Sequence, residues 1–290
     1  MAGLLENKVV IITGSGRGIG KETAKICASE GACVVINDVD PEPALETLEE
    51  IRKNGGKATA YIGDISDESG AKDIVELAKN AFGKIDALVN NAGITRDSLL
   101  VRMEVEKWDE IMKVHLRGAF LCTKNVVAEM IKQKNSGSII NLSSPAGLRG
   151  NIGQANYASA KAGLMGFTLT LAKELERYKI RVNAIAPIAW TRLTQAIPED
   201  VLKKRGEEFA QKLKSAKPEF VGHLIAFLIS DKAQHITGQI FGVFGEEFHI
   251  WSPPKIVFRK QKPGGFQIND YISILEEINM WLQKPEENVG

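Results

Sequence analysis

The 290-residue sequence is poor in cysteine, in aromatic residues and in excess charge of either sign. Its three cysteines, Cys27, Cys33 and Cys122, form no CxxC pair and no metal-site spacing, so we expect no metal centre. They fit a reducing, cytoplasmic location better than a disulfide framework. A net charge of +1 gives no reason to expect nucleic acid or an anionic membrane as a partner. No apolar run approaches the ~20 residues of a membrane span, and we expect no signal peptide.

The sequence does contain a regular alternation of two patterns. Short apolar runs rich in β-branched residues alternate with longer segments of helical spacing, which is typical of parallel strands joined by crossover helices. Strands are predicted at 9–13, 33–37, 58–62, 87–90, 138–142, 180–186 and 238–244. Helices are predicted at 18–30, 42–54, 67–82, 104–133, 155–178, 217–230 and 270–283. Because the apolar runs are continuous, both faces of the sheet should be covered. The fold class is therefore α/β, a doubly wound parallel sheet of Rossmann type with seven strands.

The region after the seventh strand is less regular. No linker separates it, so we predict one domain over 1–290, with 245–290 as a C-terminal extension. Prolines and a Gly264–Gly265 pair divide the extension into short pieces. Its apolar and aromatic residues predict that it packs on the domain or on a partner subunit.

A glycine-rich turn follows the first predicted strand. In "TGSGRGIG", Gly14, Gly18 and Gly20 lie between a buried strand and a helix. A tight turn needs residues without Cβ, and a diphosphate must approach backbone N–H groups at a helix N-terminus. Glycines alone are a weak signal, but in this position they indicate a dinucleotide-binding loop.

An acidic residue at the end of the second strand bears on the choice of cofactor. Asp38 follows the loop at the distance where a carboxylate accepts both ribose hydroxyls of an adenosine. A carboxylate there would repel a 2′-phosphate, so NAD is favoured over NADP. Arg17 argues the other way, since a basic residue in the loop can bind a 2′-phosphate. Asp38 could also be an ordinary turn acid before Pro41. Asp64 and Ile65 end the third strand, where they could meet the adenine.

The stretch "INLSSPAGLRGNIGQANYASAK" combines three residues with complementary chemistry. Tyr157 and Lys161 are four apart in a helical segment, so their side chains share one face. A lysine ammonium and a positive nicotinamide favour a phenolate and would bring the tyrosine pKa toward working range. Ser144 lies at the C-terminal end of a predicted strand, where open α/β sheets place their sites, and could hold a substrate oxygen.

Taken together, "TGSGRGIG", "NNAG", Ser144, "YASAK" and "IAP" make residues 5–244 similar to the short-chain dehydrogenase/reductase family. The resemblance implies that Tyr157 is the acid/base, that Lys161 binds the nicotinamide ribose, and that Ser144 positions the substrate carbonyl. It also implies a homodimer or homotetramer through helices 104–133 and 155–178. The implied cofactor-binding residues are Gly14, Arg17, Gly18, Ile19, Gly20, Asp38, Asp64, Ile65, Asn91, Ala92, Gly93, Tyr157, Lys161 and Pro187.

Three departures point to one branch of the family. His115 in "VHLRG" stands where the family usually has Asn, "APIAWTRLT" replaces the usual PGxxxT, and a long extension follows "TGQ". These features resemble the (3R)-hydroxyacyl-CoA dehydrogenase domain of peroxisomal multifunctional enzyme type 2. The resemblance implies NAD-dependent hydride transfer between a 3-hydroxyacyl-CoA and a 3-oxoacyl-CoA. Substrate contacts would come from about 189–212, whose basic residues could meet CoA phosphates or form a solvated helix face.

Other functions remain open at this stage. "NNAGITRDSLLVRM" also resembles 3-oxoacyl-[acyl-carrier-protein] reductases, which normally prefer NADP, so Asp38 argues against them. A hydroxysteroid or other alcohol dehydrogenase is a further alternative, and a non-catalytic NAD-binding regulator is disfavoured by the intact Ser144, Tyr157 and Lys161. His115 has two interpretations. Its imidazole, which titrates near neutral pH, supports a proton path from the lysine, or it only stabilises the helix.

Overall fold

The computed structural model describes residues 3–195, 197 and 199–282. Its chain divides after Trp251 into two compact units, and each is described by itself. None of the helices in the described ranges has the length and apolar character needed to cross a membrane.

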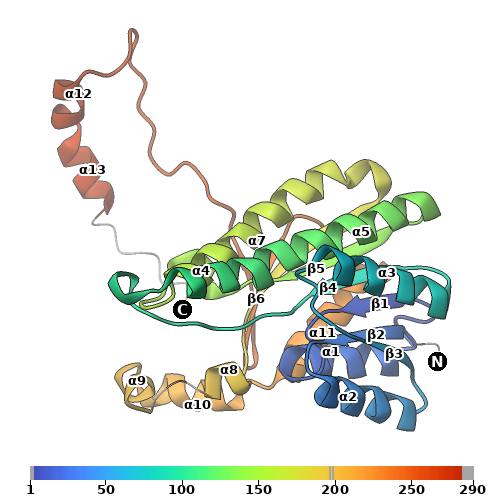
Figure 1. Ribbon diagram of the computed structural model, residues 1–290. Coiled ribbons are helices and arrows are strands. Elements are labelled where there is room, and N and C mark those ends of the chain that lie inside the picture. Colours follow the sequence, from blue (N-terminus) through green and yellow to red (C-terminus); the bar gives the residue numbers. More distant parts are fainter. Residues whose placement is uncertain (1–2, 196, 198, 283–290) are drawn as a thin grey trace. The chain divides into compact units, whose positions relative to one another are not determined.

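The first unit is built on one sheet of eight strands in the order β3-β2-β1-β4-β5-β6-β7-β8 (Figure 1). Strands β1 to β7 are parallel, and β8 pairs antiparallel with β7. The strands are β1 Val9–Ile12, β2 Cys33–Asp38, β3 Lys57–Ile62, β4 Ala87–Asn90, β5 Gly137–Leu142, β6 Ile180–Ile188, β7 Ile240–Phe244 and β8 Glu247–Trp251. The predicted doubly wound parallel sheet is confirmed. The eighth strand was not predicted, and it begins inside the segment assigned to the extension.

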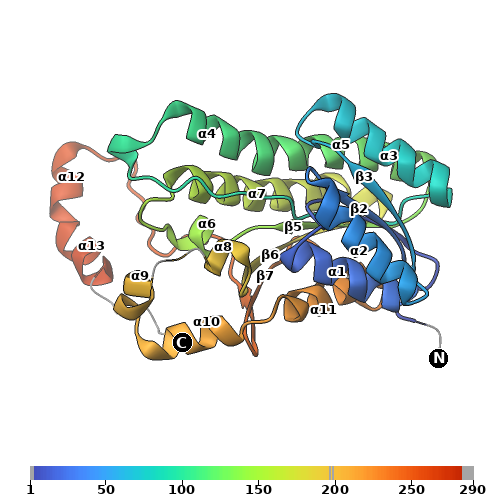
Figure 2. The same ribbon diagram turned by 60° about the horizontal axis from the view of Figure 1, so that its bottom comes forward.

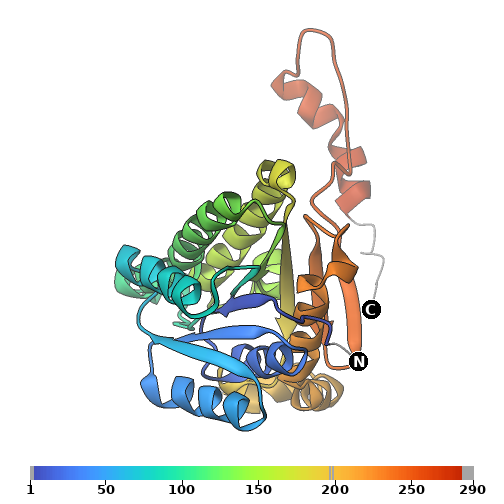
Figure 3. The ribbon, with the colours of Figure 1, turned by 90° about the vertical axis from the view of Figure 1, so that its right-hand side faces the viewer.

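Helices cover both faces of this sheet (Figure 3). On one face lie α1 Gly18–Ser29, α2 Pro41–Lys53 and α11 Pro218–Ile229, and on the other lie α3 Glu68–Phe82, α5 Gly118–Gln133 and α7 Ala155–Glu174. Successive strand residues alternate between the two cores: Val10 and Ile12 join the first, and Ile11 joins the second. Burial on both faces is the reason that the strands appear in the sequence as continuous apolar runs.

The predicted helix 104–133 is interrupted, which corrects that prediction. It consists of α4 Val105–Ile111, a π-helical segment η2 Met112–Arg117 and α5. His115 lies in the π segment, a distortion that occurs frequently at functional sites. Shorter helices are η1 Leu100–Arg102, α6 Pro145–Arg149, η3 Glu176–Tyr178, α8 Arg192–Gln195, α9 Glu199–Lys204, α10 Glu207–Ser215 and η4 Asp231–Ala233.

Over residues 252–282, the second unit contains two short helices, α12 Ile268–Ser273 and α13 Leu275–Leu282. Gln267 and Asp270 form a capping box at the start of α12, and Lys262 pairs with Asp270. The predicted helix 270–283 is divided at Ile274 into these two helices, which corrects that prediction, and residue 283 lies outside the described ranges. The packing of this unit on the domain or on a partner subunit stays a prediction.

Candidate active site

The glycine loop between β1 and α1 has the backbone shape that only glycine adopts easily. Gly14 and Gly18 have φ of +61° and +55°, in the left-handed region. A Cβ on Gly14 would lie 2.7 Å from the Cα of Ala92, and one on Gly20 would lie 2.3 Å from the carbonyl oxygen of Gly14. The helix that begins at Gly18 therefore presents its first N–H groups beside a turn whose glycines carry no side chains. This arrangement fits the diphosphate of a dinucleotide.

The end of β4 lies against this loop. The side-chain amide of Asn91 donates to the carbonyl oxygens of Thr13 (2.9 Å) and Gly14 (2.8 Å). The hydroxyl oxygen of Thr13 accepts from the backbone N–H groups of Asn91 and Ala92. The predicted residues Asn91 and Ala92 are thus brought to the glycine loop, and the Asn91 side chain fixes the loop backbone. The sequence analysis missed Thr13, which carries no motif beyond its place before Gly14.

Asp38 ends β2 beside the loop, and its carboxylate accepts from the N–H of Gly16 at 3.1 Å. Arg17, the basic residue of the loop, is bound to Asp40 at 2.6 Å. A hollow of about 430 Å³ is lined by residues of the loop and of α2, Glu42 and Glu46 among them. Its other lining residues are Gly16, Arg17, Gly18, Lys21 and Pro43.

Charge around this hollow is predominantly negative. Lys21 is itself paired with Glu50 at 2.5 Å, as Arg17 is with Asp40. The hollow is lined by two cations and by the carboxylates of Glu42 and Glu46. Three further carboxylates contact its lining residues, those of Asp38, Asp40 and Glu50, and Glu50 is shared with Lys25. A dianionic phosphate is repelled by such a field, and a ribose that carries only hydroxyls is not.

The end of β3 supplies two further predicted cofactor residues. Asp64 accepts hydrogen bonds from the hydroxyl and N–H of Ser66 and pairs with Lys113 at 3.2 Å. Burial alone would raise the pKa of Asp64, but these hydrogen bonds and the Lys113 charge outweigh burial and lower that pKa. Ile65 is buried and packs toward Gly118 of α5.

Ser144, Tyr157 and Lys161 are brought together as predicted. Ser144 follows β5 and caps α6, where its hydroxyl oxygen accepts from the N–H of Ala146 at 3.2 Å. It is also a hydrogen-bond partner of the Tyr157 hydroxyl. Tyr157 and Lys161 are one turn apart on α7, and the Lys161 Nζ lies 5.5 Å from the centroid of the Tyr157 ring. The Tyr157 residue as a whole is partly exposed.

The two titratable groups of this trio have strongly shifted pKa values. Burial raises the pKa of Tyr157 to about 12, although the Ser144 hydrogen bond acts in the opposite direction. Burial lowers the pKa of Lys161 to about 7. Lys161 is only 4% exposed, and its Nζ donates to the carbonyl oxygen of Leu142 at 2.6 Å. In the free protein, the lysine alone does not bring the tyrosine pKa into working range.

His115 is buried beside this trio, with only 2% exposure. Its Nε2 lies 2.7 Å from the carbonyl oxygen and 3.0 Å from the N–H nitrogen of Ile94, and its ring meets the Tyr157 ring edge-on at 5.3 Å. Burial lowers the pKa of His115 to about 3, so the prediction that it titrates near neutral pH is wrong. A Cβ on Gly93 would lie 2.5 Å from His115 Cε1, which explains the glycine of "NNAG".

Two buried residues that the sequence analysis missed position the catalytic helix. The Asn156 side chain donates to the carbonyls of Arg96 and Lys107 and accepts from the N–H of Tyr157. The Ser143 hydroxyl donates to the carbonyl of Lys161 at 2.7 Å. Thr191 after β6 was also missed, and its methyl group faces Gly18. Pro187 lies within β6 and pairs with Val243 of β7.

Comparisons with known proteins give one family model and several similar proteins. The family model described as short chain dehydrogenase matches residues 8–202. The 3-oxoacyl-[acyl-carrier-protein] reductase FabG of Thermotoga maritima is 45% identical over 83% of this chain and 98% of its own. The hydroxyacyl-CoA dehydrogenase ChsB1 of Mycobacterium tuberculosis is 39% identical over 90% of this chain and 84% of its own. The crystal structure of a short chain dehydrogenase from Mycobacterium avium has a TM-score of 0.85 and 33% identity, covering 96% of each chain.

Proposed function

The chain belongs to the short-chain dehydrogenase family, and we propose that it is an NAD-dependent dehydrogenase of 3-hydroxyacyl-CoA esters. Membership of this family makes the protein an oxidoreductase that acts on CH–OH groups. The choice of a CoA ester is supported by the extent of one similarity. The match to the hydroxyacyl-CoA dehydrogenase covers 90% of the chain. Because the first unit ends at Trp251, a match of this length must extend into the second unit. Carrier-protein reductases such as that of Thermotoga maritima match only 82–84% of the chain.

The trio supplies the acid–base chemistry. Ser144 can donate its hydroxyl hydrogen to the substrate oxygen, and Tyr157 stands beside it to exchange a proton with the same oxygen. With a pKa of about 12, the Tyr157 phenol holds its proton at neutral pH and can protonate the oxygen during reduction. In oxidation it must take the alcohol proton, and the Lys161 ammonium favours the phenolate that does so. A nicotinamide cofactor, when bound, donates or accepts the hydride.

The preference for NAD is supported by the charge beside the glycine loop. Asp38 lies against Gly16, Arg17 is engaged by Asp40, and carboxylates predominate around the hollow. We expect NAD to be favoured over NADP by well above tenfold in kcat/KM. Replacing Asp38 by Asn should narrow this ratio by relieving the repulsion of the 2′-phosphate.

A second candidate is a 3-oxoacyl-[acyl-carrier-protein] reductase, which the 45% identity to such an enzyme favours. The discriminating experiment is a substrate panel assayed with both NAD and NADP. It comprises 3-hydroxyacyl-CoA esters of several lengths, 3-oxoacyl carrier proteins, hydroxysteroids and free secondary alcohols. The proposal predicts the highest kcat/KM for a CoA ester with NAD. A higher kcat/KM for the 3-oxoacyl carrier protein would favour the second candidate function over the proposed one. Equal rates with NAD and NADP would contradict the proposed preference for NAD.

Two broader proposals accompany this function. We place the protein in the cytoplasm, from its cysteine content, and expect a homodimer or homotetramer assembled through α4, α5 and α7. Phe120 and Trp108 are exposed on this helical surface, which is consistent with a partner subunit there. Light scattering of the purified protein measures the assembly directly.

A further inference from the structure

Three cations of α6, α10 and the turn before α10 lie over aromatic rings of α10, β7 and β8. The Arg149 guanidinium is 4.7 Å from the centroid of Trp251. The Arg205 guanidinium is 5.4 Å from Phe209, and the Lys212 ammonium is 4.6 Å from Phe244. We call these six residues the cationic arc. A guanidinium stacked on a ring keeps its N–H edge free for an oxyanion.

The members of the cationic arc are joined into one surface by further contacts. Phe209 packs on Phe244 with ring centroids 5.6 Å apart, which links Arg205 to Lys212. Lys212 pairs with Glu247 at 2.5 Å, Glu247 contacts His249, and His249 packs on Trp251. Arg205 closes the circuit by donating to Asn151, which follows α6, at 3.0 Å. The unpredicted strand β8 and the helices α9 and α10 therefore hold the arc in place.

The arc lies within reach of the reacting centre. Arg149 is the last residue of α6, and Ser144 caps the same helix. At a rise of ~1.5 Å per residue, five residues separate them by about 7.5 Å along the axis. Figure 2 shows α8, α9 and α10 as a group of helices that follows β6. A thioester held at Ser144 can thus extend its remaining chain toward the arc.

The sheet order places the arc and the hollow at the glycine loop on opposite halves of the molecule. The hollow adjoins β1 and β2, the arc adjoins β7 and β8, and the trio follows β5 and lies between them. Five carboxylates lie in or against the hollow, with Arg17, Lys21 and Lys25 as their cation partners. The arc has three cations, and among the described residues one carboxylate pairs with them, that of Glu247. The carboxylates beside the glycine loop therefore disfavour an additional 2′-phosphate on the cofactor, whereas the arc attracts phosphate.

We propose that the cationic arc binds the phosphates of coenzyme A during turnover. The inference rests on the proposed function and names the part of the chain that recognises the CoA end of the substrate. It explains how the protein can reject NADP, with its additional 2′-phosphate, and still accept a phosphorylated substrate. Charge-assisted hydrogen bonds from the two guanidiniums supply most of the recognition, since Lys212 is already engaged by Glu247.

The test compares the same acyl group on two carriers. Steady-state kinetics are measured with a 3-oxoacyl-CoA and with the matching 3-oxoacyl-pantetheine, which lacks every phosphate, for the wild type and for the double variant Arg149→Met, Arg205→Met. We expect KM for the CoA ester to rise tenfold or more, with kcat and both pantetheine constants unchanged. Lys214→Met removes an exposed cation of α10 outside the arc and should leave all constants unchanged.

Each other outcome has a distinct meaning. An unchanged KM for the CoA ester, or an equal rise for both thioesters, overturns the inference and leaves the proposed function in place. A selective loss of activity with 3-oxoacyl carrier protein also overturns it, because the arc would then bind an acidic protein. If the wild type turns over neither thioester, the proposed function itself fails. Circular dichroism and melting of each variant exclude misfolding as the cause of a change.

Discussion

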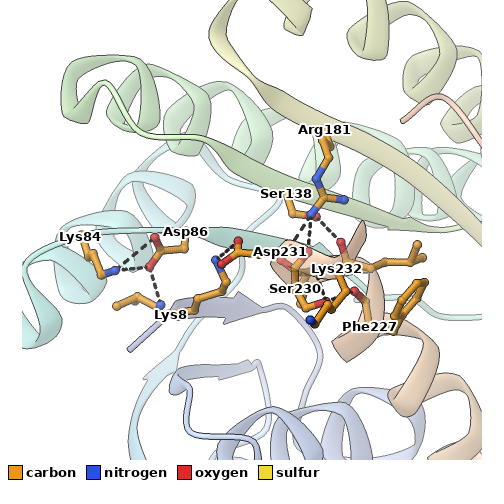
Figure 4. Close-up of polar contacts among 12 residues, drawn as sticks. Lys8, Lys84, Asp86, Ser138, Arg181, Phe227, Ser230, Asp231 and Lys232 are labelled. Carbon is orange, nitrogen blue, oxygen red and sulfur yellow. Dashed lines mark hydrogen bonds and ion pairs between the residues drawn. The ribbon is translucent and has the colours of Figure 1, made fainter. Parts of the chain in front are cut away.

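At the amino-terminal edge of the sheet, Arg181 donates hydrogen bonds to the carbonyls of Ile229, Ser230 and Ile236, as Figure 4 shows in part. Lys8 pairs there with Asp231 at 2.8 Å. At the carboxyl-terminal edge, Lys161 is buried and its ammonium donates a hydrogen bond to the carbonyl of Leu142. Among the described residues, no carboxylate pairs with Lys161. The Nδ1 atom of His115 is buried there without a hydrogen-bond partner.

This difference separates stability from function within one sheet. Arg181 is half-buried and Lys161 is buried, and burial lowers the pKa of both. Only the amino-terminal edge offsets burial with several acceptors and a nearby acid, Asp231. Strongly perturbed groups that lack such compensation concentrate at sites that do chemistry. The two edges should therefore respond to mutation in opposite ways.

The largest expected effect is on turnover at the carboxyl-terminal edge. Tyr157→Phe removes the only proton that the ring can exchange, and we expect kcat to fall by about 10²–10⁴-fold. The aromatic ring stays, so NADH binding, followed by fluorescence, and the melting temperature should remain close to those of the wild type. Turnover close to wild type would show that another group transfers the proton.

At the amino-terminal edge, Arg181→Met should affect stability and leave activity unchanged. It removes three hydrogen bonds to backbone carbonyls, at an expected cost of about 1–3 kcal/mol in the free energy of unfolding. The Ile236 and Ser230 carbonyls keep a second donor, Asn183 and the N–H of Ala233 respectively. Lys8→Met is the control, because its partner Asp231 is 86% exposed and such pairs contribute below about 1 kcal/mol. Urea unfolding measures both. A large loss of kcat in Arg181→Met would contradict the separation of the two edges.

Lys161→Met should have the reverse effect, with activity lost and stability gained. Folding lowers the pKa of Lys161 from 10.5 to about 7, so the unfolded chain binds the proton more tightly. The resulting cost to the folded state is complete below pH ~7 and disappears as the pH rises toward ~10.5. We expect the variant to gain on the order of 1 kcal/mol or more at pH ~6, and less at pH ~9.

The control for Lys161→Met is Lys173→Met, which replaces an exposed lysine on the same helix. It should change the free energy of unfolding by less than about 0.5 kcal/mol at either pH. Urea unfolding at the two pH values gives both differences. A stability gain in Lys161→Met that does not vary with pH would show that hydrophobic burial of the new side chain is the cause.

The smallest expected effect concerns His115. Because its pKa is about 3, the ring is neutral throughout the working range, and His115→Asn should leave the midpoints of the pH–rate profile where they are. The substitution should change kcat only modestly, since Asn can also hydrogen-bond the Ile94 backbone. A shifted midpoint would mean that His115 ionises during turnover and takes part in proton transfer.

The sequence predicted the sheet well and some local details poorly. The first seven strands were placed within two residues, because each is buried on both faces and has a continuous apolar run. The strand β8 alternates instead, with Phe248 and Ile250 exposed, and its segment was assigned to the extension. The π segment around His115 keeps the apolar spacing of a helix, so periodicity could not reveal it.

What the sequence determined by itself was the set of chemical groups and their strand-end positions. Local rules of backbone and helix geometry were enough to place these groups. They apply to the glycines before α1, to Asp38 at the end of β2, and to the spacing of Tyr157 and Lys161. Only the tertiary structure decided what surrounds these groups. The pKa shifts of Lys161 and His115 arise from burial by segments far apart in the chain, and the cationic arc exists only because β8 returns beside β7. Burial and charge depend on neighbours in space, which no local pattern specifies.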